Sequence, residues 1–177
     1  MLYTRTGDKG TSGLFGTRER FPKNSLIYEA LGVVDELNSL LGVCRARSNK
    51  TKGGLDVARE ILKVQECLFP IQAELAGAQK SVTQTHVDEL EDVIKRFESK
   101  IENPHAFVIP GATEFSALCD YARAVSRRAE RIVISTQHVQ NVSPAALAYL
   151  NRLSSFLYAL ARYSAVKESA KESPPFY

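Results

Sequence analysis

The chain has 177 residues, the size of one ordinary domain that can bury about two thirds of its unfolded surface without a metal or a disulfide. Lysine and arginine total 23 against 20 aspartate and glutamate, and the net charge of +3 is too small to indicate a nucleic-acid partner or a membrane surface. The sequence has no apolar run of membrane-spanning length and no recognisable targeting segment at its start. These features predict a soluble protein with no nucleic-acid or membrane partner.

The cysteines and histidines are isolated from one another along the chain. They are Cys44, Cys67, Cys119, His86, His105 and His138. An odd number of cysteines, each among apolar helical residues, is typical of reduced thiols in a protein core, and this favours a cytoplasmic location. No pair of cysteines or histidines has the short spacing that a zinc site uses, so we predict that the side chains hold no metal ion.

After the first 23 residues, apolar residues recur at intervals of three and four, which predicts helices and an all-α fold. The expected helices span residues 24–48, 55–77, 85–100, 113–137 and 143–172. Thr113 can cap the fourth helix, and Ser143 followed by proline is a typical start for the fifth. Two prolines and a glycine in residues 103–111 prevent a helix there. We therefore expect one domain over residues 1–177, with a five-helix bundle in residues 24–172.

Four of the ten glycines lie close together near the start of the chain, at positions 7, 10, 13 and 16. Glycine lets backbone amides approach an anion, and cationic and hydroxyl side chains supply donors for phosphate oxygens. The candidate phosphate ligands are Thr4, Arg5, Thr6, Gly7, Lys9, Ser12, Gly13 and Lys23. Neither the P-loop pattern nor G-x-G-x-x-G is present. The pattern leaves two interpretations open, a triphosphate-binding segment within residues 1–23 and a flexible arm of polar turns.

The fourth expected helix carries a stripe of charged residues. At about 100° per residue, Arg123, Arg127 and Glu130 lie opposite the apolar face of the helix. With Arg128 and Arg131, four arginines stand near a single glutamate and repel one another unless an anion or a partner's carboxylates neutralise them. The stripe indicates a polyanionic ligand or a subunit interface, and a solvated charged face is the alternative.

The fifth expected helix has a polar stripe of its own, formed by Asn151, Ser155, Tyr158 and Arg162, clear of its apolar face. Asparagine is a poor helix former, so Asn151 is either a ligand of a base or ribose or an exposed surface residue. Asp35 on the first helix lies opposite the apolar positions of that helix and is expected to point outward.

Six short segments occur in an order and at spacings that resemble the PduO-type family of ATP:cob(I)alamin adenosyltransferases. They are residues 4–12, 34–39, 107–111, 122–123, 127–131 and 149–154. The resemblance covers residues 4 to about 163, which is nearly the whole chain. Each segment alone is a weak signal, but six of them in order are highly specific. Two positions depart from the common family pattern, because Ser155 replaces a frequent aspartate and Ala112 a frequent glycine.

The resemblance implies a homotrimer of five-helix bundles with the active site between adjacent subunits. It implies that the glycine-spaced segment, with Lys9 and Lys23, binds the triphosphate of ATP from one subunit. The neighbouring subunit is implied to bind ATP through Arg127, Arg128, Glu130, Arg131 and Asn151. The serine at position 155 removes a carboxylate near the fifth helix, whereas the alanine at position 112 only restricts a turn.

The implied reaction is attack by cob(I)alamin on the 5′ carbon of ATP, which gives adenosylcobalamin and inorganic triphosphate. Because the cobalt is the nucleophile, no serine, cysteine or lysine nucleophile is needed, and Mg²⁺ is expected on the phosphates. On the corrinoid side, Asp35 and Arg123 are implied to form an ion pair across the interface. Phe107 is implied to fill the space beneath the corrin, where it excludes the lower axial base and eases reduction of Co(II).

The resemblance also implies that a cobalamin reductase supplies the substrate and that a B12-dependent enzyme receives the product. Two other functions stay open on the sequence. One is a regulatory bundle that binds nucleotide without transfer activity, against which Phe107 and the pair of Asp35 with Arg123 argue. The other is a purely structural helical oligomer, for which the glycine spacing and the arginine stripe would be coincidence.

Overall fold

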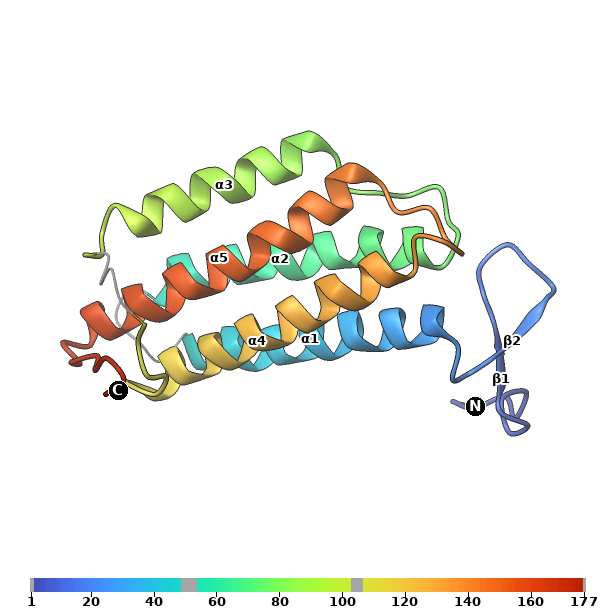
Figure 1. Ribbon diagram of the computed structural model, residues 1–177, viewed down its shortest axis with the longest axis horizontal. Helices are drawn as coiled ribbons and strands as arrows, with labels where there is room; N and C mark the ends of the chain where they lie inside the picture. Colours follow the sequence, from blue (N-terminus) through green and yellow to red (C-terminus); the bar gives the residue numbers. More distant parts are fainter. Residues whose placement is uncertain (1, 49–53, 103–106, 177) are drawn as a thin grey trace.

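The computed structural model describes residues 2–48, 54–102 and 107–176 and forms a bundle of five helices (Figure 1). The helices are α1 (Leu26–Ser48), α2 (Gly54–Leu75), α3 (Gln84–Glu98), α4 (Glu114–Ser135) and α5 (Pro144–Lys167). The expected all-α five-helix fold is confirmed. No helix in the described part of the chain has both the length and the apolar character needed to cross a membrane.

The core of the bundle lies between all five helices. Helix α4 packs against α1 and α5, α1 also packs against α2, and α3 packs against α5. The largest fully buried side chains are Leu37, Leu41, Ile61, Leu68, Ile71, Leu75, Phe97, Leu150, Leu153, Phe156, Leu157 and Leu160. Burial of each such side chain stabilises the fold by about 1.5–3 kcal/mol before the loss of conformational entropy is subtracted.

The helix starts that the sequence predicts for α4 and α5 are found in the structure. The Thr113 hydroxyl accepts the Ser116 amide at 3.1 Å, and the Ser116 hydroxyl accepts the Thr113 amide at 2.8 Å, which is a capping box. At the start of α5, the Ser143 hydroxyl accepts the Ala146 amide at 3.2 Å. The Glu74 carboxylate accepts the Ser143 amide at 2.6 Å and so joins the end of α2 to the start of α5.

Helix α5 ends at Lys167, earlier than the expected residue 172. Ser169 has a φ of 54°, in the left-handed region, and the Ala170 amide donates to the Ala165 carbonyl at 2.9 Å. This pair of features is a Schellman motif, which stops a helix and turns the chain. The turned segment, residues 170–176, lies against the loop before α4, because the Ile109 amide donates to the Ser173 carbonyl at 2.9 Å.

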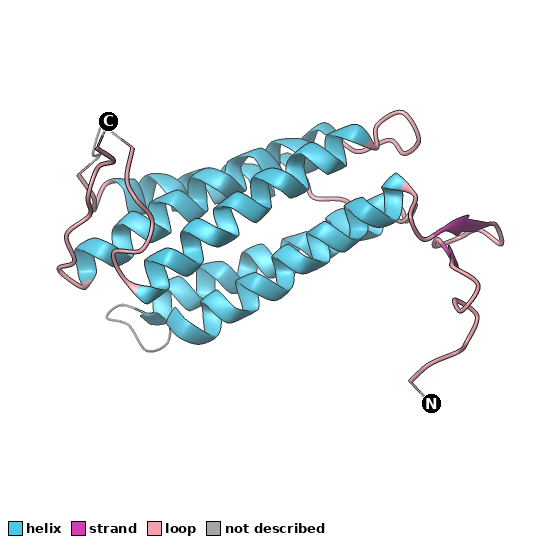
Figure 2. Cartoon of the chain, turned by 60° about the horizontal axis from the view of Figure 1, so that its bottom comes forward, coloured by secondary structure: helices cyan, strands magenta, loops and turns pink. Residues whose placement is uncertain are grey.

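A small hairpin precedes α1 and was not expected from the sequence. Strands β1 (Thr11–Gly13) and β2 (Arg20–Pro22) pair antiparallel, with Ser12 opposite Phe21. Strands of three residues are too short to show an alternating apolar pattern. The hairpin stands off the end of the bundle at which α1 begins, while the loop before α4 and the C-terminus lie at the other end (Figures 1 and 2).

Candidate functional site

The glycine-spaced segment folds back on the residues just before α1. The Lys23 amide donates to the Gly10 carbonyl at 2.8 Å, and Gly10 has a φ of 74°, which favours glycine. The Lys23 ammonium lies directly over Gly7, since a Cβ atom added to Gly7 would be 2.9 Å from Nζ. The fold therefore brings Lys23 to the segment, as the sequence suggested. Lys9 is exposed, and phosphate binding by this cluster stays a prediction.

The other predicted phosphate ligands of the glycine-spaced segment lie in the same part of the structure. The hydroxyls of Thr4 and Thr6 lie 2.8 Å apart. Arg5 has a φ of 60°, an uncommon conformation for a residue with a side chain, and such conformations concentrate at functional sites. Ser12 and Gly13 belong to β1. All of the predicted phosphate ligands from the first 23 residues thus lie in one small, exposed substructure.

Arg20 organises this substructure, a role that was not expected from the sequence. Its Nη2 atom donates to the carbonyls of Thr6 and Thr11, both at 2.7 Å, and its Nε donates to the Thr11 hydroxyl at 3.0 Å. The Arg20 side chain on β2 therefore holds both the turn at Thr6 and strand β1. The only sequence signal was a cation next to the Phe21–Pro22 pair, which does not distinguish it from an ordinary surface arginine.

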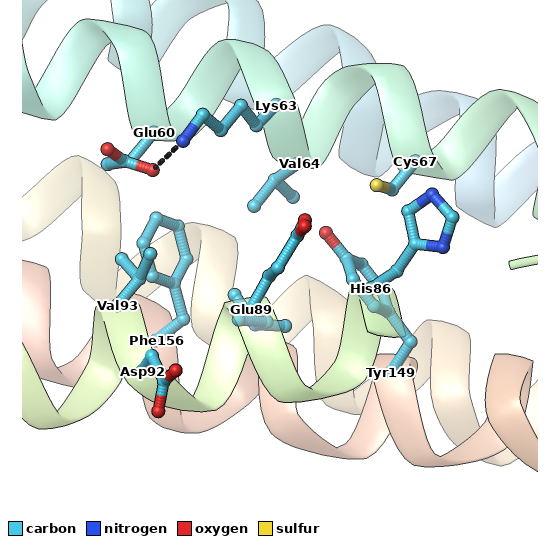
Figure 3. A pocket seen from close by; sticks show the side chains of 11 residues that line it. Glu60, Lys63, Val64, Cys67, His86, Glu89, Asp92, Val93, Tyr149 and Phe156 are labelled. Atoms are coloured by element: carbon cyan, nitrogen blue, oxygen red, sulfur yellow. Dashed lines mark ion pairs between the residues drawn. The ribbon is translucent and has the colours of Figure 1, made fainter. Parts of the chain in front are cut away.

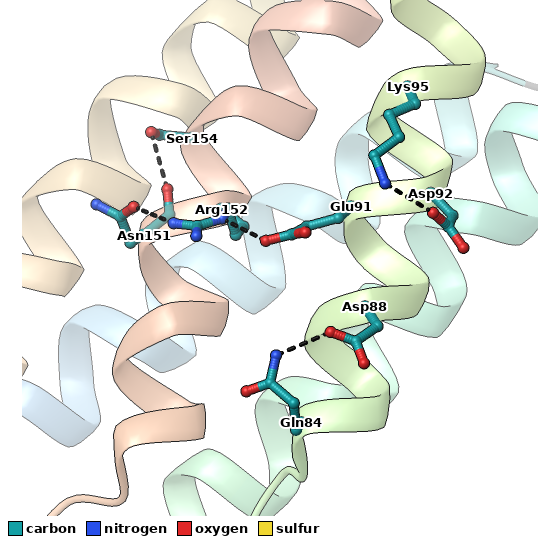
Figure 4. Close-up of polar contacts among 8 residues, drawn as sticks. All are labelled: Gln84, Asp88, Glu91, Asp92, Lys95, Asn151, Arg152 and Ser154. Carbon is teal, nitrogen blue, oxygen red and sulfur yellow. Dashed lines mark hydrogen bonds and ion pairs between the residues drawn. The ribbon is translucent and has the colours of Figure 1, made fainter.

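Helices α4 and α5 bring two predicted ATP ligands together. Asn151 donates from Nδ2 to Glu130 Oε1 at 2.7 Å. Arg152, for which no role was expected from the sequence, donates to Asn151 Oδ1 at 2.8 Å and to Glu91 Oε1 of α3 at 2.8 Å (Figure 4). The amide of Asn151 is therefore held from both sides. This contact accounts for an asparagine in the middle of a helix better than simple surface exposure does.

The arginine stripe is partly neutralised within the chain. Arg128 pairs with Glu36 of α1, with 2.5 Å between Nη2 and Oε2. The sequence led us to expect an anion or a partner's carboxylates, and not a carboxylate from another helix of the same chain. Arg127 and Arg131 are exposed, and within the described residues neither has an ion-pair partner. The chain thus presents two free guanidinium groups beside the contact of Glu130 with Asn151.

Asp35 and Arg123 lie in different hollows of the same chain. Asp35 is exposed in a groove of about 340 Å³ between α1 and α2, beside the exposed Leu62 and Phe69. Arg123 is half-buried in a hollow of about 220 Å³ that also contains Ser155, and its Nε lies 3.8 Å from Asp120 Oδ1. The structure does not bring the predicted ion pair together within one chain. It also places Ser155, one of the two positions that depart from the common family pattern, beside Arg123.

Phe107 is 78% exposed in the loop before α4. That loop and the glycine-spaced segment occupy opposite ends of the bundle (Figure 1). A single chain therefore does not assemble the two parts of the predicted site, the phosphate segment and the aromatic on the corrinoid side.

The prediction that Arg162 lies on the polar stripe of α5 is wrong. Arg162 is 2% exposed, and its Nη2 donates to Asp120 Oδ2 at 2.5 Å. Glu172 from the C-terminal segment lies 2.6 Å from Arg162 Nε. The segment after α5 covers this end of the helix, so a position that helical periodicity places outside becomes buried. The stripe that remains consists of the exposed Asn151 and Ser155 and the half-buried Tyr158.

A cleft of about 410 Å³ lies between α2, α3 and α5 and contains no predicted site residue (Figure 3). Cys67, Tyr149, His86 and Glu89 line it. Burial raises the pKa of the Cys67 thiol, and burial likewise raises the pKa of Tyr149 far above its ordinary value. Neither group ionises readily near neutral pH, so the cleft offers no activated nucleophile.

Three comparisons agree on the relatives of this chain. A family model described as cobalamin adenosyltransferase matches residues 2–164. The corrinoid adenosyltransferase of Citrobacter freundii is 39% identical over 168 residues, covering 91% of this chain and 93% of that protein, and the one of Bacillus subtilis is 36% identical over 165 residues, covering 91% and 84%. A variant of the PduO-type ATP:corrinoid adenosyltransferase from Lactobacillus reuteri, complexed with cobalamin and ATP, has a TM-score of 0.92 at 26% identity, with all of both chains covered.

Proposed function

Because the chain belongs to the cobalamin adenosyltransferase family, we infer that it transfers the 5′-deoxyadenosyl group of ATP to cob(I)alamin or a related corrinoid. The family expected from the six sequence segments is confirmed. The observation that carries the function is the match along nearly the whole chain, in sequence to corrinoid adenosyltransferases and in fold to a relative solved with cobalamin and ATP.

The reaction forms one bond and breaks one bond. Cobalt(I) donates an electron pair to the 5′ carbon of ATP, the carbon–oxygen bond breaks, and its electrons leave on inorganic triphosphate. We propose that residues 4–13 and Lys23 bind that leaving group. An ammonium and backbone amides already in place stabilise the negative charge as it develops. Mg²⁺ would reach the site on the phosphates, where the neighbouring hydroxyls of Thr4 and Thr6 are oxygen ligands of the kind it accepts.

We propose that the complete site forms between two subunits of a homotrimer. The phosphate segment would come from one subunit, and the face of α4 and α5 from its neighbour, through Arg127, Arg128, Glu130, Arg131 and Asn151. Two observations support this arrangement. The phosphate segment and the loop before α4, which carries Phe107, lie at opposite ends of the bundle (Figure 1), and Arg127 and Arg131 are exposed cations without an ion-pair partner in the described part of the chain.

The corrinoid side of the proposed site uses Phe107 and an intersubunit ion pair of Asp35 with Arg123. An exposed phenyl ring is suited to contact with an apolar ligand face, and Phe107 is mostly exposed. Asp35 is exposed beside two exposed apolar side chains, Leu62 and Phe69, which suits either a corrin ring or a neighbouring subunit. A reductase that supplies Co(I), an acceptor enzyme for the product and a cytoplasmic location complete the proposal.

The proposed function is tested by mixing the protein with ATP, Mg²⁺ and chemically reduced cob(I)alamin and following the corrinoid absorption spectrum. Formation of the cobalt–carbon bond, with one inorganic triphosphate released per product, is the expected result. Absence of an alkylated product would refute the transferase. Binding of ATP without turnover would instead support the regulatory bundle that the sequence left open.

A further inference from the structure

The C-terminal segment is anchored to the bundle through a buried arginine. Arg162 of α5 is in contact with two carboxylates, Asp120 of α4 at 2.5 Å and Glu172 at 2.6 Å, and its guanidinium lies 4.9 Å from the centre of the Tyr158 ring. A buried guanidinium is costly unless it is paired, and both carboxylates lie within ion-pair distance of Arg162. Asp120 belongs to the helical bundle itself, whereas Glu172 fixes the chain beyond the last helix.

The anchored segment in turn holds the loop that carries Phe107. Ser173, next to Glu172, accepts the Ile109 amide at 2.9 Å. Ile109 is two residues from Phe107, and both side chains are exposed, so side-chain burial does little to fix this part of the loop. A backbone hydrogen bond from a fixed partner restricts the loop where packing does not.

The ion pair of Glu172 with Arg162 fixes the position of the C-terminal segment more than it stabilises the fold. Burial raises the pKa of the Glu172 carboxyl, the positive charge of Arg162 opposes that effect, and the negative charge of Asp120 adds to it, so the pKa stays above its ordinary value. A carboxyl with a raised pKa gains little from its ion pair at neutral pH. The main effect of this ion pair is therefore to fix where the C-terminal segment lies.

We propose that Glu172 is a positioning residue for the transfer reaction: through Arg162 it fixes the C-terminal segment, and through the bond of Ser173 with Ile109 it holds Phe107 where the ring excludes the lower axial base. This inference rests on the proposed role of Phe107. If the C-terminal segment only covered the end of the bundle, replacing Glu172 would not change the position of Phe107.

The first test measures the loop without any ligand. Glu172→Gln keeps the size of the side chain and removes its charge. Glu168→Gln is the matched control, since Glu168 is an exposed glutamate at the end of α5 and, among the described residues, accepts the Ser164 hydroxyl at 3.0 Å and has no ion-pair partner. Hydrogen exchange is followed at the Ile109 amide in the full chain. The exchange rate of a protected amide follows how often the loop opens locally. We therefore expect exchange at Ile109 to be about tenfold faster in Glu172→Gln and unchanged in Glu168→Gln. Equal exchange in wild type and Glu172→Gln would overturn the proposal.

The second test separates the axial-base step from the transfer itself. Starting from cob(II)alamin with a chemical reductant, Glu172→Gln should react about tenfold more slowly, the size of effect that a small misplacement causes, and starting from cob(I)alamin it should react at nearly the wild-type rate. The electron paramagnetic resonance spectrum of bound cob(II)alamin with ATP should keep more of the nitrogen coupling from the axial base. Equal slowing from both oxidation states would overturn the positioning role, whereas a wild-type protein inactive with cob(I)alamin would refute the proposed function instead.

Discussion

The phosphate segment, residues 4–13, leaves little room around the Lys23 ammonium at Gly7. The ammonium of Lys23 occupies the space that a side chain at position 7 would need, with Cε 3.2 Å and Nζ 2.9 Å from an added Cβ. Real Cβ atoms essentially never come so close to another heavy atom, so any side chain at position 7 displaces the lysine tip. Because the lysine side chain is long, exposed and flexible, it can move at little cost in stability.

Replacing Gly7 with alanine should therefore weaken ATP binding without unfolding the protein. The added methyl group moves the Lys23 ammonium away from the position proposed for the triphosphate, and we expect KM for ATP to rise about tenfold, as for the loss of one charge-assisted contact. Steady-state kinetics and thermal unfolding give the two readouts. Gly32→Ala on α1, where an added Cβ meets no atom within 4 Å, is the control. An unchanged KM in Gly7→Ala would show that Lys23 does not contact the phosphates.

Phe107→Ala tests the proposed axial-base role of the ring directly. Since Phe107 is mostly exposed, its removal leaves no cavity in the core, and the unfolding temperature should not change. The rate from cob(II)alamin should fall by about a hundredfold, the size of effect expected when a reacting group is poorly placed, with a much smaller loss from cob(I)alamin. Equal losses in the two assays would count against this role.

Residues that act through the tertiary structure were the ones that the sequence did not reveal. Lys23 could be connected to the phosphate segment because it lies just before a predicted helix start. Arg20 and Arg162 could not be interpreted correctly, because their contacts depend on how the chain folds back: Arg20 reaches Thr6 and Thr11 through the hairpin, and Arg162 reaches Asp120 of another helix. Periodicity within one helix contains no information about a segment that later covers it.

At the scale of elements, Glu60 joins α2 to α3. The carboxylate is 2% exposed and lies 2.9 Å from Arg96 Nη2 of α3 and 3.2 Å from Lys63 Nζ of its own helix. Burial raises the pKa of Glu60, but hydrogen bonds and positive charge from Arg96 and Lys63 outweigh burial and hold the pKa below its ordinary value. The contribution of Glu60 to stability is thus present above the unfolded pKa and is lost as the pH falls through the folded pKa.

Glu60→Gln should lower the free energy of unfolding by about 2 kcal/mol at pH 7, the typical cost of losing a hydrogen bond to a charged group. At an acidic pH below the folded pKa of this carboxyl, the difference from wild type should shrink, because the wild-type carboxyl is then protonated as well. Urea unfolding at the two pH values measures both. Asp92→Asn, which breaks an exposed ion pair with Lys95, should change stability by less than about 1 kcal/mol. A Glu60→Gln difference that is equal at both pH values would contradict this account.

Elements with a long apolar repeat could be predicted, and elements defined by a few backbone contacts could not. The five helices follow from residues spaced by three and four, and the starts of α4 and α5 follow from Thr113 and Ser143. The hairpin of β1 and β2 has three residues in each strand, and the end of α5 depends on the left-handed conformation of Ser169. Serine is not the residue that usually marks such a helix end.

At the scale of the whole molecule, the parts of the proposed site point to assembly. The phosphate segment extends beyond one end of the bundle, and the loop with Phe107 and the C-terminus lie at the other (Figure 1). The motif order in the sequence indicated the family but did not contain this separation, which is a property of the three-dimensional fold. A site shared between subunits accounts for both exposed ends and for Arg127 and Arg131, which have no ion-pair partner among the described residues.

The most direct test of the shared site is subunit complementation with two charge-reversed chains. Lys23→Glu disables the phosphate segment, and Arg127→Glu disables the face of α4, so each homo-oligomer should be inactive with ATP and cob(I)alamin. Mixed trimers, assembled by refolding the two chains together and purified through two different tags, should recover about one third of wild-type activity, because a ring of three that contains both chains has one interface in three at which an intact segment meets an intact α4 face. Mixed oligomers no more active than either parent would contradict a site built from two subunits.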